Sequence, residues 1–339
     1  MTEDDIWAHL DALAKPRRSL GRLEALAVRL ALTQARPDPR TRPRALVLFA
    51  GDHGCVADGV SAWPSDVTGL MVATIAAGRA TSNALAAAHG CDLRLVDVGV
   101  AAPPPADPPA FYRDARVAAG TASLARGPAM SVADFDAAWA VGADEATRAV
   151  AADAAVLIAG EMGIGNTTPA AALSALLTGA APAAMVGQGA GADAAVLAAK
   201  TRIVAEAVEH AHPLLGQAPR TAIAALAGYE IAAMAGFFAR GAALGATLLL
   251  DGYVATAAAL IAERLAPGTV RAMIAGHRSA EPGHGAALAH LGLEPLLDWE
   301  MRLGEGSGAL VALPLLDAAA ALLGDVARLD AIGTERRDG

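Results

Sequence analysis

A single carboxylate, Glu305, lies between two glycines in the segment 302–308, just before an apolar stretch of small residues. Glycine adopts backbone angles that other residues avoid, and it lets a ligand approach the chain closely. An isolated acid in such a loop is either a turn residue or a catalytic base. The choice between these two depends on what the rest of the sequence places beside it.

The second candidate for chemistry is the glycine-rich segment 160–169, which follows an apolar run. We expect a helix to begin here, with Thr168 as N-cap and Pro169 at the first helical position. Backbone N–H groups at such a start favour an anion. The segment lacks the Gly-Lys-Ser/Thr of a Walker loop, and Thr168 stands where a dinucleotide fingerprint has its third glycine. A plain strand-to-helix turn is the alternative, and Glu161 is either a second site acid or a residue that orients the loop.

A second glycine loop, 187–191, precedes a helix that we expect Asp193 to cap. Lys200 lies about two turns into that helix and could reach back to a phosphate. A solvated helix lysine is an equally good interpretation of the spacing alone. Lys15 is the only other lysine in the chain, which favours a specific use of Lys200.

The remaining polar motifs do not indicate a metal site or a hydrolase. Asp52 and His53 form a pair in a tight turn, where structural hydrogen bonding is the favoured interpretation. His277 and His284 flank Ser279 in a similar way, but no group of these residues has metal-ligand spacing. No Gly-x-Ser-x-Gly elbow follows a predicted strand. The chemistry therefore rests on carboxylates, glycine backbone and one lysine. From this set of residues we predict neither a metal nor a cofactor. That set suits a reaction at the anomeric carbon of a sugar phosphate.

Composition excludes several classes of protein. The chain has 339 residues, a net charge of −9 and only 4% aromatic residues. Nucleic-acid binding needs a basic surface, which this balance does not offer. The longest uncharged run, 162–192, contains prolines and many glycines and is a poor membrane span. Two cysteines without metal spacing and an acidic N-terminus favour a soluble cytoplasmic protein.

Short apolar runs alternate with longer alanine-rich segments along most of the chain. This alternation predicts βα units, a parallel sheet and a doubly wound, Rossmann-like α/β fold of about six strands. Nearly every run leads into a glycine-containing polar segment, so the polar motifs should meet at the carboxyl edge of the sheet. The predicted strands are 45–50, 93–98, 154–159, 183–186, 247–250 and 270–275.

Several motifs together resemble one family, the nicotinate-nucleotide:dimethylbenzimidazole phosphoribosyltransferases of cobalamin biosynthesis. The resemblance runs from about residue 6 to residue 325. The motifs are residues 15–24, 51–54, 160–169, 251–253, 279–281 and 302–308, of which 160–169 and 302–308 are long and specific.

The resemblance implies transfer of the phosphoribosyl group of nicotinate mononucleotide to 5,6-dimethylbenzimidazole, with inversion at the anomeric carbon. It makes Glu305 the general base, and it lets Glu161 stabilise the charge of the transition state. It also implies a homodimer, with a large α/β domain (37–285), a small helical domain from both chain ends (1–36 and 286–330) and a flexible tail (331–339). The residues that it places at the phosphate and ribose are Gly163, Gly165, Asn166, Thr167, Thr168, Lys200 and Ser279.

The pocket for the acceptor base departs from the family pattern. We assign Trp63, Met71, Leu303 and Gly304 to it, and the first two make it more apolar than in relatives with polar residues there. Trp63 as a plain core residue is the alternative. The resemblance therefore leaves the acceptor open between benzimidazoles, purines and phenolic compounds. Gln188 and Ala190 also depart from the usual Arg and Thr, which weakens any phosphate contact from that loop.

Two other classes of function remain open at this point. A nucleotide-dependent oxidoreductase would show a full dinucleotide fingerprint after its first strand, and this chain has Gly-Asp-His-Gly there instead. A non-catalytic nucleotide-binding relative would lack the acid at position 305, which this chain keeps.

Overall fold

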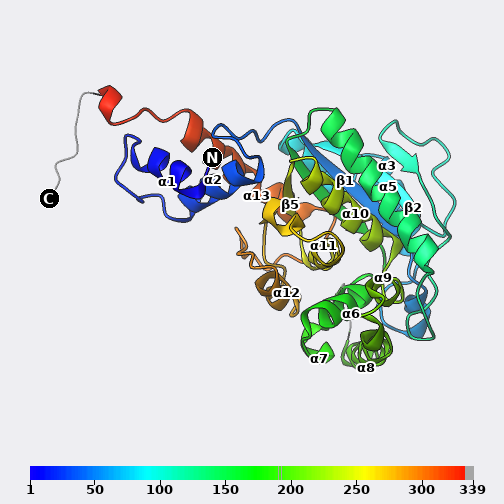
Figure 1. The fold of residues 1–339 in the computed structure, drawn as a ribbon. Coiled ribbons are helices and arrows are strands. Elements are labelled where there is room, and N and C mark those ends of the chain that lie inside the picture. The colour runs from blue at the N-terminus through cyan, green and yellow to red at the C-terminus, as the bar shows by residue number, and fades with distance from the viewer. Residues whose placement is uncertain (190, 192, 333–339) are drawn as a thin grey trace.

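A six-stranded parallel sheet forms the centre of the computed structural model, which describes residues 1–189, 191 and 193–332 (Figure 1). The sheet order is β3-β2-β1-β4-β5-β6, so the winding direction reverses between β1 and β4. This confirms the predicted doubly wound sheet, whose ligands bind where the winding reverses. The strands are β1 (Arg44–Gly51), β2 (Asp92–Gly99), β3 (Tyr112–Asp114), β4 (Val156–Met162), β5 (Thr247–Leu250) and β6 (Met273–Ala275).

One predicted strand is wrong, one strand was not predicted, and the predicted strand 270–275 begins only at Met273, after a short 3-10 helix. The run 183–186 is not a strand, because Pro182–Met185 forms the short helix α7 with proline at its start. A four-residue apolar run does not distinguish the two structures by periodicity. The sixth strand is instead β3, which pairs with β2 at the edge of the sheet. Its sequence, Tyr-Arg-Asp, carries no apolar run, as is common for a short charged edge strand.

Alternate residues of the central strands face opposite layers of helices. In β1, Val47 and Phe49 pack into one apolar cluster, whereas Leu46 and Leu48 pack into the other. Both faces of β1 are buried, which explains its continuous apolar sequence. The first cluster includes residues of α5 (Val132–Ala151), α6 (Thr167–Thr178), α8 (Ala194–Ala211), α9 (Pro219–Ala224), α10 (Tyr229–Ala243), α11 (Tyr253–Leu265) and α12 (His284–His290). The second includes residues of α1 (Glu3–Asp11), α2 (Arg22–Thr33), α3 (Asp66–Ala76), α4 (Thr81–Ala88) and α13 (Ser307–Gly324).

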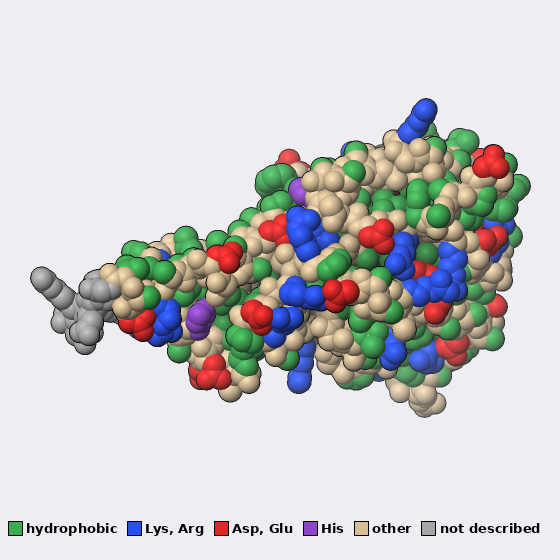
Figure 2. Space-filling view, turned by 90° about the horizontal axis from the view of Figure 1, so that it is seen from above, with side chains coloured by type: hydrophobic (Ala, Val, Ile, Leu, Met, Phe, Trp, Pro, Cys, Tyr) green, Lys and Arg blue, Asp and Glu red, His purple; other side chains and the backbone are tan. Residues whose placement is uncertain are grey.

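The two ends of the described chain lie together at the narrow end of the molecule (Figures 1 and 2). The Ala14 N–H donates to Ala327 O at 2.7 Å, and the Leu329 N–H donates to Ala12 O at 2.9 Å. This places both chain ends in one helical unit, and the proposed boundaries 1–36 and 286–330 stay a prediction. Of the tail predicted to be flexible, residues 333–339 lie outside the described residues.

One described helix, α13, is long and apolar enough to cross a membrane by length and composition alone, and 56% of it is buried in the protein. It packs against α2 and α4 and contributes Leu310 and Leu313 to the second cluster. Basic and acidic side chains are interspersed on the face shown in Figure 2.

Candidate active site

A pocket of about 900 Å³, counted with its open mouth, lies at the carboxyl edge of the sheet. Its wall is formed by segments that follow β4, β5 and β6 and by residues 60–62, which follow β1. The winding of the sheet reverses between β1 and β4. Segments that are far apart in sequence thus share one wall, as the parallel sheet requires. The lining residues are Val60–Ala62, Glu161–Thr167, Gln188, Gly189, Lys200, Asp251–Ala255, His277, Ser279, Glu281 and Arg302–Gly304.

The structure brings most of the sequence-predicted site residues to this pocket and leaves four outside its wall. Those in the wall are Glu161, Gly163, Gly165, Asn166, Thr167, Lys200, Ser279, Leu303 and Gly304. The four outside are Trp63, Met71, Thr168 and Glu305. Trp63 is 51% exposed and follows the lining residue Ala62, whereas Thr168 is fully buried in α6.

The glycine loop turns into helix α6 earlier than its sequence suggests. The Asn166 N–H donates to Gly163 O, and the Thr168 N–H donates to Gly165 O, so the chain is already coiled before Thr168. Asn166 is therefore the N-cap and Thr167 the first helical residue, which corrects the expected cap at Thr168 and the expected first position of Pro169. Asn166 and Thr167 at this helix start line the pocket, and a helix N-terminus favours an anion.

Close packing forces glycine at the start of this loop. A Cβ on Gly163 would overlap Gly51 O, at the end of the neighbouring strand β1. Gly165 has a φ of +87°, a left-handed backbone that side chains other than glycine rarely adopt. The loop therefore keeps its path only with these two glycines.

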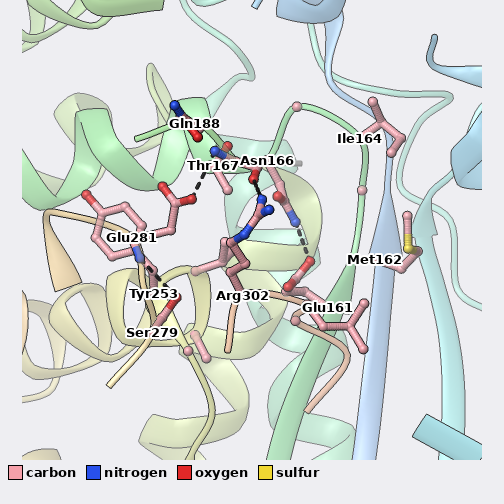
Figure 3. A pocket seen from close by; sticks show the side chains of 18 of the residues that line it. Glu161, Met162, Ile164, Asn166, Thr167, Gln188, Tyr253, Ser279, Glu281 and Arg302 are labelled. Carbon is pink, nitrogen blue, oxygen red and sulfur yellow. Dashed lines mark hydrogen bonds between the residues drawn. The ribbon is translucent and has the colours of Figure 1, made fainter. Parts of the chain in front are cut away.

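Glu161 is buried at the end of β4, where the Asn166 amide donates to its carboxyl group (Figure 3). Burial raises the pKa of Glu161 well above its usual value, and the carboxylates of Asp251 and Glu230 add to the change. The Glu305 loop packs closely against Glu161, since a Cβ on Gly304 would overlap Glu161 Oε1. The site therefore contains an acid whose charged form is disfavoured by its surroundings.

Lys200 is 1% exposed and joins the two glycine loops. Its ammonium group donates to Thr167 Oγ1 at 2.7 Å and to Gly187 O at 3.1 Å. Burial lowers the pKa of Lys200 to about 8, although the Glu281 carboxylate opposes the change. The structure thus brings a cation beside the first turn of α6, and Asp193 caps α8 as expected.

Several side chains hold the second glycine loop against the pocket. Glu281 Oε1 accepts the Gly189 N–H at 2.9 Å, and the Tyr253 hydroxyl donates to Met185 O at 2.9 Å. Arg302 donates to Gly189 O at 2.8 Å, and Figure 3 shows its guanidinium pointing toward the loop that carries Asn166. Arg302 and Tyr253 were not assigned to the site from the sequence, although they belong to the motifs 302–308 and 251–253.

Ser279 is positioned by a neutral histidine. The Ser279 N–H donates to His284 Nδ1 at 2.8 Å, and His284 Nε2 lies 2.9 Å from Thr256 Oγ1. Burial lowers the pKa of His284 to about 3, with His277 and Arg278 adding to the change. The ring is therefore neutral, with Nδ1 as acceptor and the proton on Nε2.

The Asp52–His53 pair lies behind the glycine loop rather than in the pocket wall. His53 Nε2 is 2.9 Å from Glu230 Oε1, and both side chains are buried. Although burial lowers the pKa of His53, the Glu230 carboxylate outweighs it and the net change is upward. Asp52 accepts the Ala101 N–H at 2.8 Å. These contacts agree with a structural role for the pair. In the described part of the chain, no three His, Cys, Asp or Glu side chains are grouped to hold a metal.

Asp251 holds the backbone of the Glu305 loop. Its carboxylate, directly after β5, accepts N–H groups from Gly306 at 3.0 Å, Gly308 at 2.7 Å and Ala309 at 3.3 Å. Burial raises the pKa of Asp251, and His277 and these donors oppose the change. Asp251 was not assigned to the site from the sequence. Its place directly after a predicted strand was the feature that could have indicated a role there.

Glu305 itself has an unusual backbone. Gly304, Glu305 and Gly306 have φ angles of +86°, +59° and +77°, so three successive residues are left-handed. This conformation is costly for a residue with a side chain, and it recurs at functional sites. Glu305 is 3% exposed and lies directly behind Gly304, a lining residue of the pocket.

The sheet order and the pocket at its switch point define a doubly wound α/β protein with a pocket at the carboxyl edge of its sheet. A family model described as phosphoribosyltransferase matches residues 1–333. The nicotinate-nucleotide–dimethylbenzimidazole phosphoribosyltransferase of Thermus thermophilus is 46% identical, with 93% of this chain and 92% of that protein covered. The protein of the same name from Mycobacterium tuberculosis is 48% identical, with 97% and 91% covered.

The fold agrees with these sequence similarities. The crystal structure of CobT from Thermus thermophilus matches with a TM-score of 0.94 at 44% identity, covering 98% of this chain and 100% of that chain. The chain belongs to the nicotinate-nucleotide–dimethylbenzimidazole phosphoribosyltransferase family, and it is a phosphoribosyltransferase.

Proposed function

We propose that the protein transfers the phosphoribosyl group of nicotinate mononucleotide to 5,6-dimethylbenzimidazole, giving nicotinate and α-ribazole 5′-phosphate for cobalamin biosynthesis. The observation that carries the proposal is the pairing of two features around one pocket. A helix start with a buried ammonium, Lys200, lies on one side, and the acid Glu305 lies behind the wall on the other. A nucleotide phosphate suits the first feature and an azole proton suits the second.

The phosphate of the nucleotide binds at the start of α6 in this proposal. The start of α6 at Asn166 and Thr167 supplies the positive end of the helix dipole, and the Lys200 ammonium beside Thr167 supplies a full positive charge. Helix N-termini and lysines favour phosphate by the same electrostatics. Ser279, held by His284, faces the same pocket and is assigned to the ribose and phosphate.

The reaction exchanges one C–N bond at the anomeric carbon for another. The bond to the nicotinate nitrogen breaks, and its electron pair leaves with nicotinate, which departs as a neutral pyridine ring. One benzimidazole nitrogen attacks from the opposite face, which inverts the configuration, while the other gives its proton to Glu305. An azole attacks poorly if its proton has nowhere to go, so a placed carboxylate accelerates this step.

Glu161 is assigned to the positive charge that develops on the sugar. Burial and neighbouring acids raise the pKa of Glu161, so they disfavour its charged form. The pyridinium ring of the bound nucleotide or an oxocarbenium-like transition state opposes this effect and favours the carboxylate. Glu161 thus carries negative charge when the reaction needs it.

The acceptor base binds beside Leu303 and Gly304 in this proposal, near the loop that carries Trp63. Met71 lies on α3, half-buried and outside the wall of the pocket. An apolar rim favours a dimethylated benzimidazole over a purine, because a purine must leave polar edge groups unpaired there. Phenolic and purine acceptors are the competing substrates for the same site.

We also propose a homodimer. Large apolar side chains remain exposed on and beside the pocket wall, among them Trp63 at 51%, Leu303 at 54% and Trp299 at 64%. Such side chains often mark a protein–protein contact. Sedimentation equilibrium should give twice the chain mass of 33.9 kDa. A monomer at micromolar concentration would contradict this assignment.

A cytoplasmic location is proposed as well. Cys55 and Cys91 are free and buried, and burial raises the pKa of each thiol to about 12. Such thiols need no oxidising compartment. Cell fractionation that recovers the protein with membranes or outside the cytoplasm would contradict the proposal.

Glu305→Gln should fold normally and lose turnover by a factor on the order of 100 to 10,000, because the amide cannot accept the azole proton. The assay mixes nicotinate mononucleotide, dimethylbenzimidazole and protein, and measures α-ribazole 5′-phosphate. Glu294→Gln, an exposed glutamate that pairs with Arg22, is the matched control and should keep full activity. Full turnover in Glu305→Gln would remove Glu305 as the base.

The value of kcat/KM for nicotinate mononucleotide should fall as pH rises through about 8, because Lys200 then loses the proton that attracts phosphate. Lys200→Arg should remove this fall, since the charge of arginine persists. Lys200→Met should have a low kcat/KM for nicotinate mononucleotide at every pH. If only the KM of the base changed in Lys200→Met, the phosphate assignment would be wrong.

A further inference from the structure

The Glu305 carboxylate makes a specific contact away from the pocket, with Ser82 in the first turn of helix α4. The Ser82 hydroxyl donates to Glu305 Oε2 at 2.9 Å, and the Ser82 N–H is 3.4 Å from the same oxygen. Ser82 is fully buried, so water does not compete for its hydroxyl. The contact joins residues 223 positions apart in the chain.

Both ends of this contact are fixed by packing. Helix α4 packs against α13, the helix that directly follows the Glu305 loop. On the other side, Asp251 holds the loop backbone through Gly306 and Gly308, and the left-handed φ of Glu305 sets the direction of its side chain. The carboxylate therefore has one supported orientation, in which Oε2 is engaged by Ser82.

We propose that Ser82 is a positioning residue for the phosphoribosyl transfer, holding Glu305 Oε2 so that Oε1 takes the proton of the acceptor base. The proposal rests on the proposed function, because it assumes that Glu305 is the base. Within the described residues, the hydrogen bonds of the Glu305 side chain all involve Oε2. A carboxylate with one oxygen tied loses rotational freedom, and that loss is incurred before the substrate arrives.

The charged surroundings explain why a neutral donor is useful at this place. Glu305 lies near two other acids, Glu161 behind Gly304 and Asp251 behind Gly306, with His277 beside Asp251. Neighbouring acids compete for ionisation, because each negative charge disfavours the next. The Ser82 hydroxyl is a hydrogen-bond donor to the carboxylate that adds no cation, and a cation at this place would repel the pyridinium ring of the nucleotide.

Ser82→Ala is expected to lower kcat about 10- to 100-fold, as the loss of a hydrogen bond to a charged group implies. The KM for nicotinate mononucleotide should not change, because Ser82 lies on α4, on the other face of the sheet from the helices that carry Lys200 and Thr167. The acid limb of the kcat–pH profile should move to higher pH, since the ionised carboxylate has lost a donor. Ser82→Thr should restore most of kcat and the original profile.

Thr33→Val is the matched control for loss of a buried hydroxyl. Thr33 lies on α2 and bonds Leu30 O and Thr247, the first residue of β5, at the opposite end of that strand from the pocket. It should lose stability with kcat and the pH profile unchanged. If Ser82→Ala behaves in the same way as Thr33→Val, the Ser82 contact is structural only and the proposal is overturned.

A measurement without turnover separates this proposal from the proposed function. Carboxyl ¹³C-labelled glutamate gives one NMR titration curve for each side chain, and Glu305→Gln identifies the curve of residue 305 by its disappearance. Ser82→Ala should shift that curve to higher pH even if the wild-type protein makes no α-ribazole 5′-phosphate, in which case only the assumed reaction fails. An unshifted curve would overturn the Ser82 assignment, whatever the activity.

Discussion

The site depends on one buried carboxylate that accepts three backbone N–H groups. Asp251 stands directly after β5 and bonds the amides of Gly306, Gly308 and Ala309, where helix α13 begins. It satisfies donors that a helix start cannot pair internally, and it fixes a loop whose backbone is left-handed at three residues in succession. These three hydrogen bonds offset part of the cost of the Glu305 conformation.

The parallel sheet brings the other parts of the site to the same edge. The glycine loop after β4 packs on the end of β1 so closely that Gly163 has no room for a Cβ. Lys200 joins that loop to the segment around Gly187, and Arg302 joins the same segment to the Glu305 loop. These hydrogen bonds link the two glycine loops to each other and to the Glu305 loop.

The sequence predicts the parts of this arrangement that follow from local pattern. The apolar runs of β1, β2, β4 and β5 and the glycine loops between strand and helix are visible in it because burial on both faces demands continuous apolar residues. The edge strand β3 was missed because its residues are polar, and 183–186 was misassigned because so short a run is ambiguous. Contacts between distant segments, such as Ser82 with Glu305 or His284 with Ser279, leave no local pattern at all.

The central claim is that Asp251 holds the loop that places Glu305, and hydrogen exchange tests it most directly. In the wild-type protein, the amides of Gly306, Gly308 and Ala309 should be protected. In Asp251→Ala their exchange should be at least about tenfold faster, with kcat reduced and the amide of Phe237 in α10 unchanged; Asp251→Asn, which keeps an accepting oxygen, should lie between. Unchanged protection of the three amides together with unchanged kcat in Asp251→Ala would contradict the account.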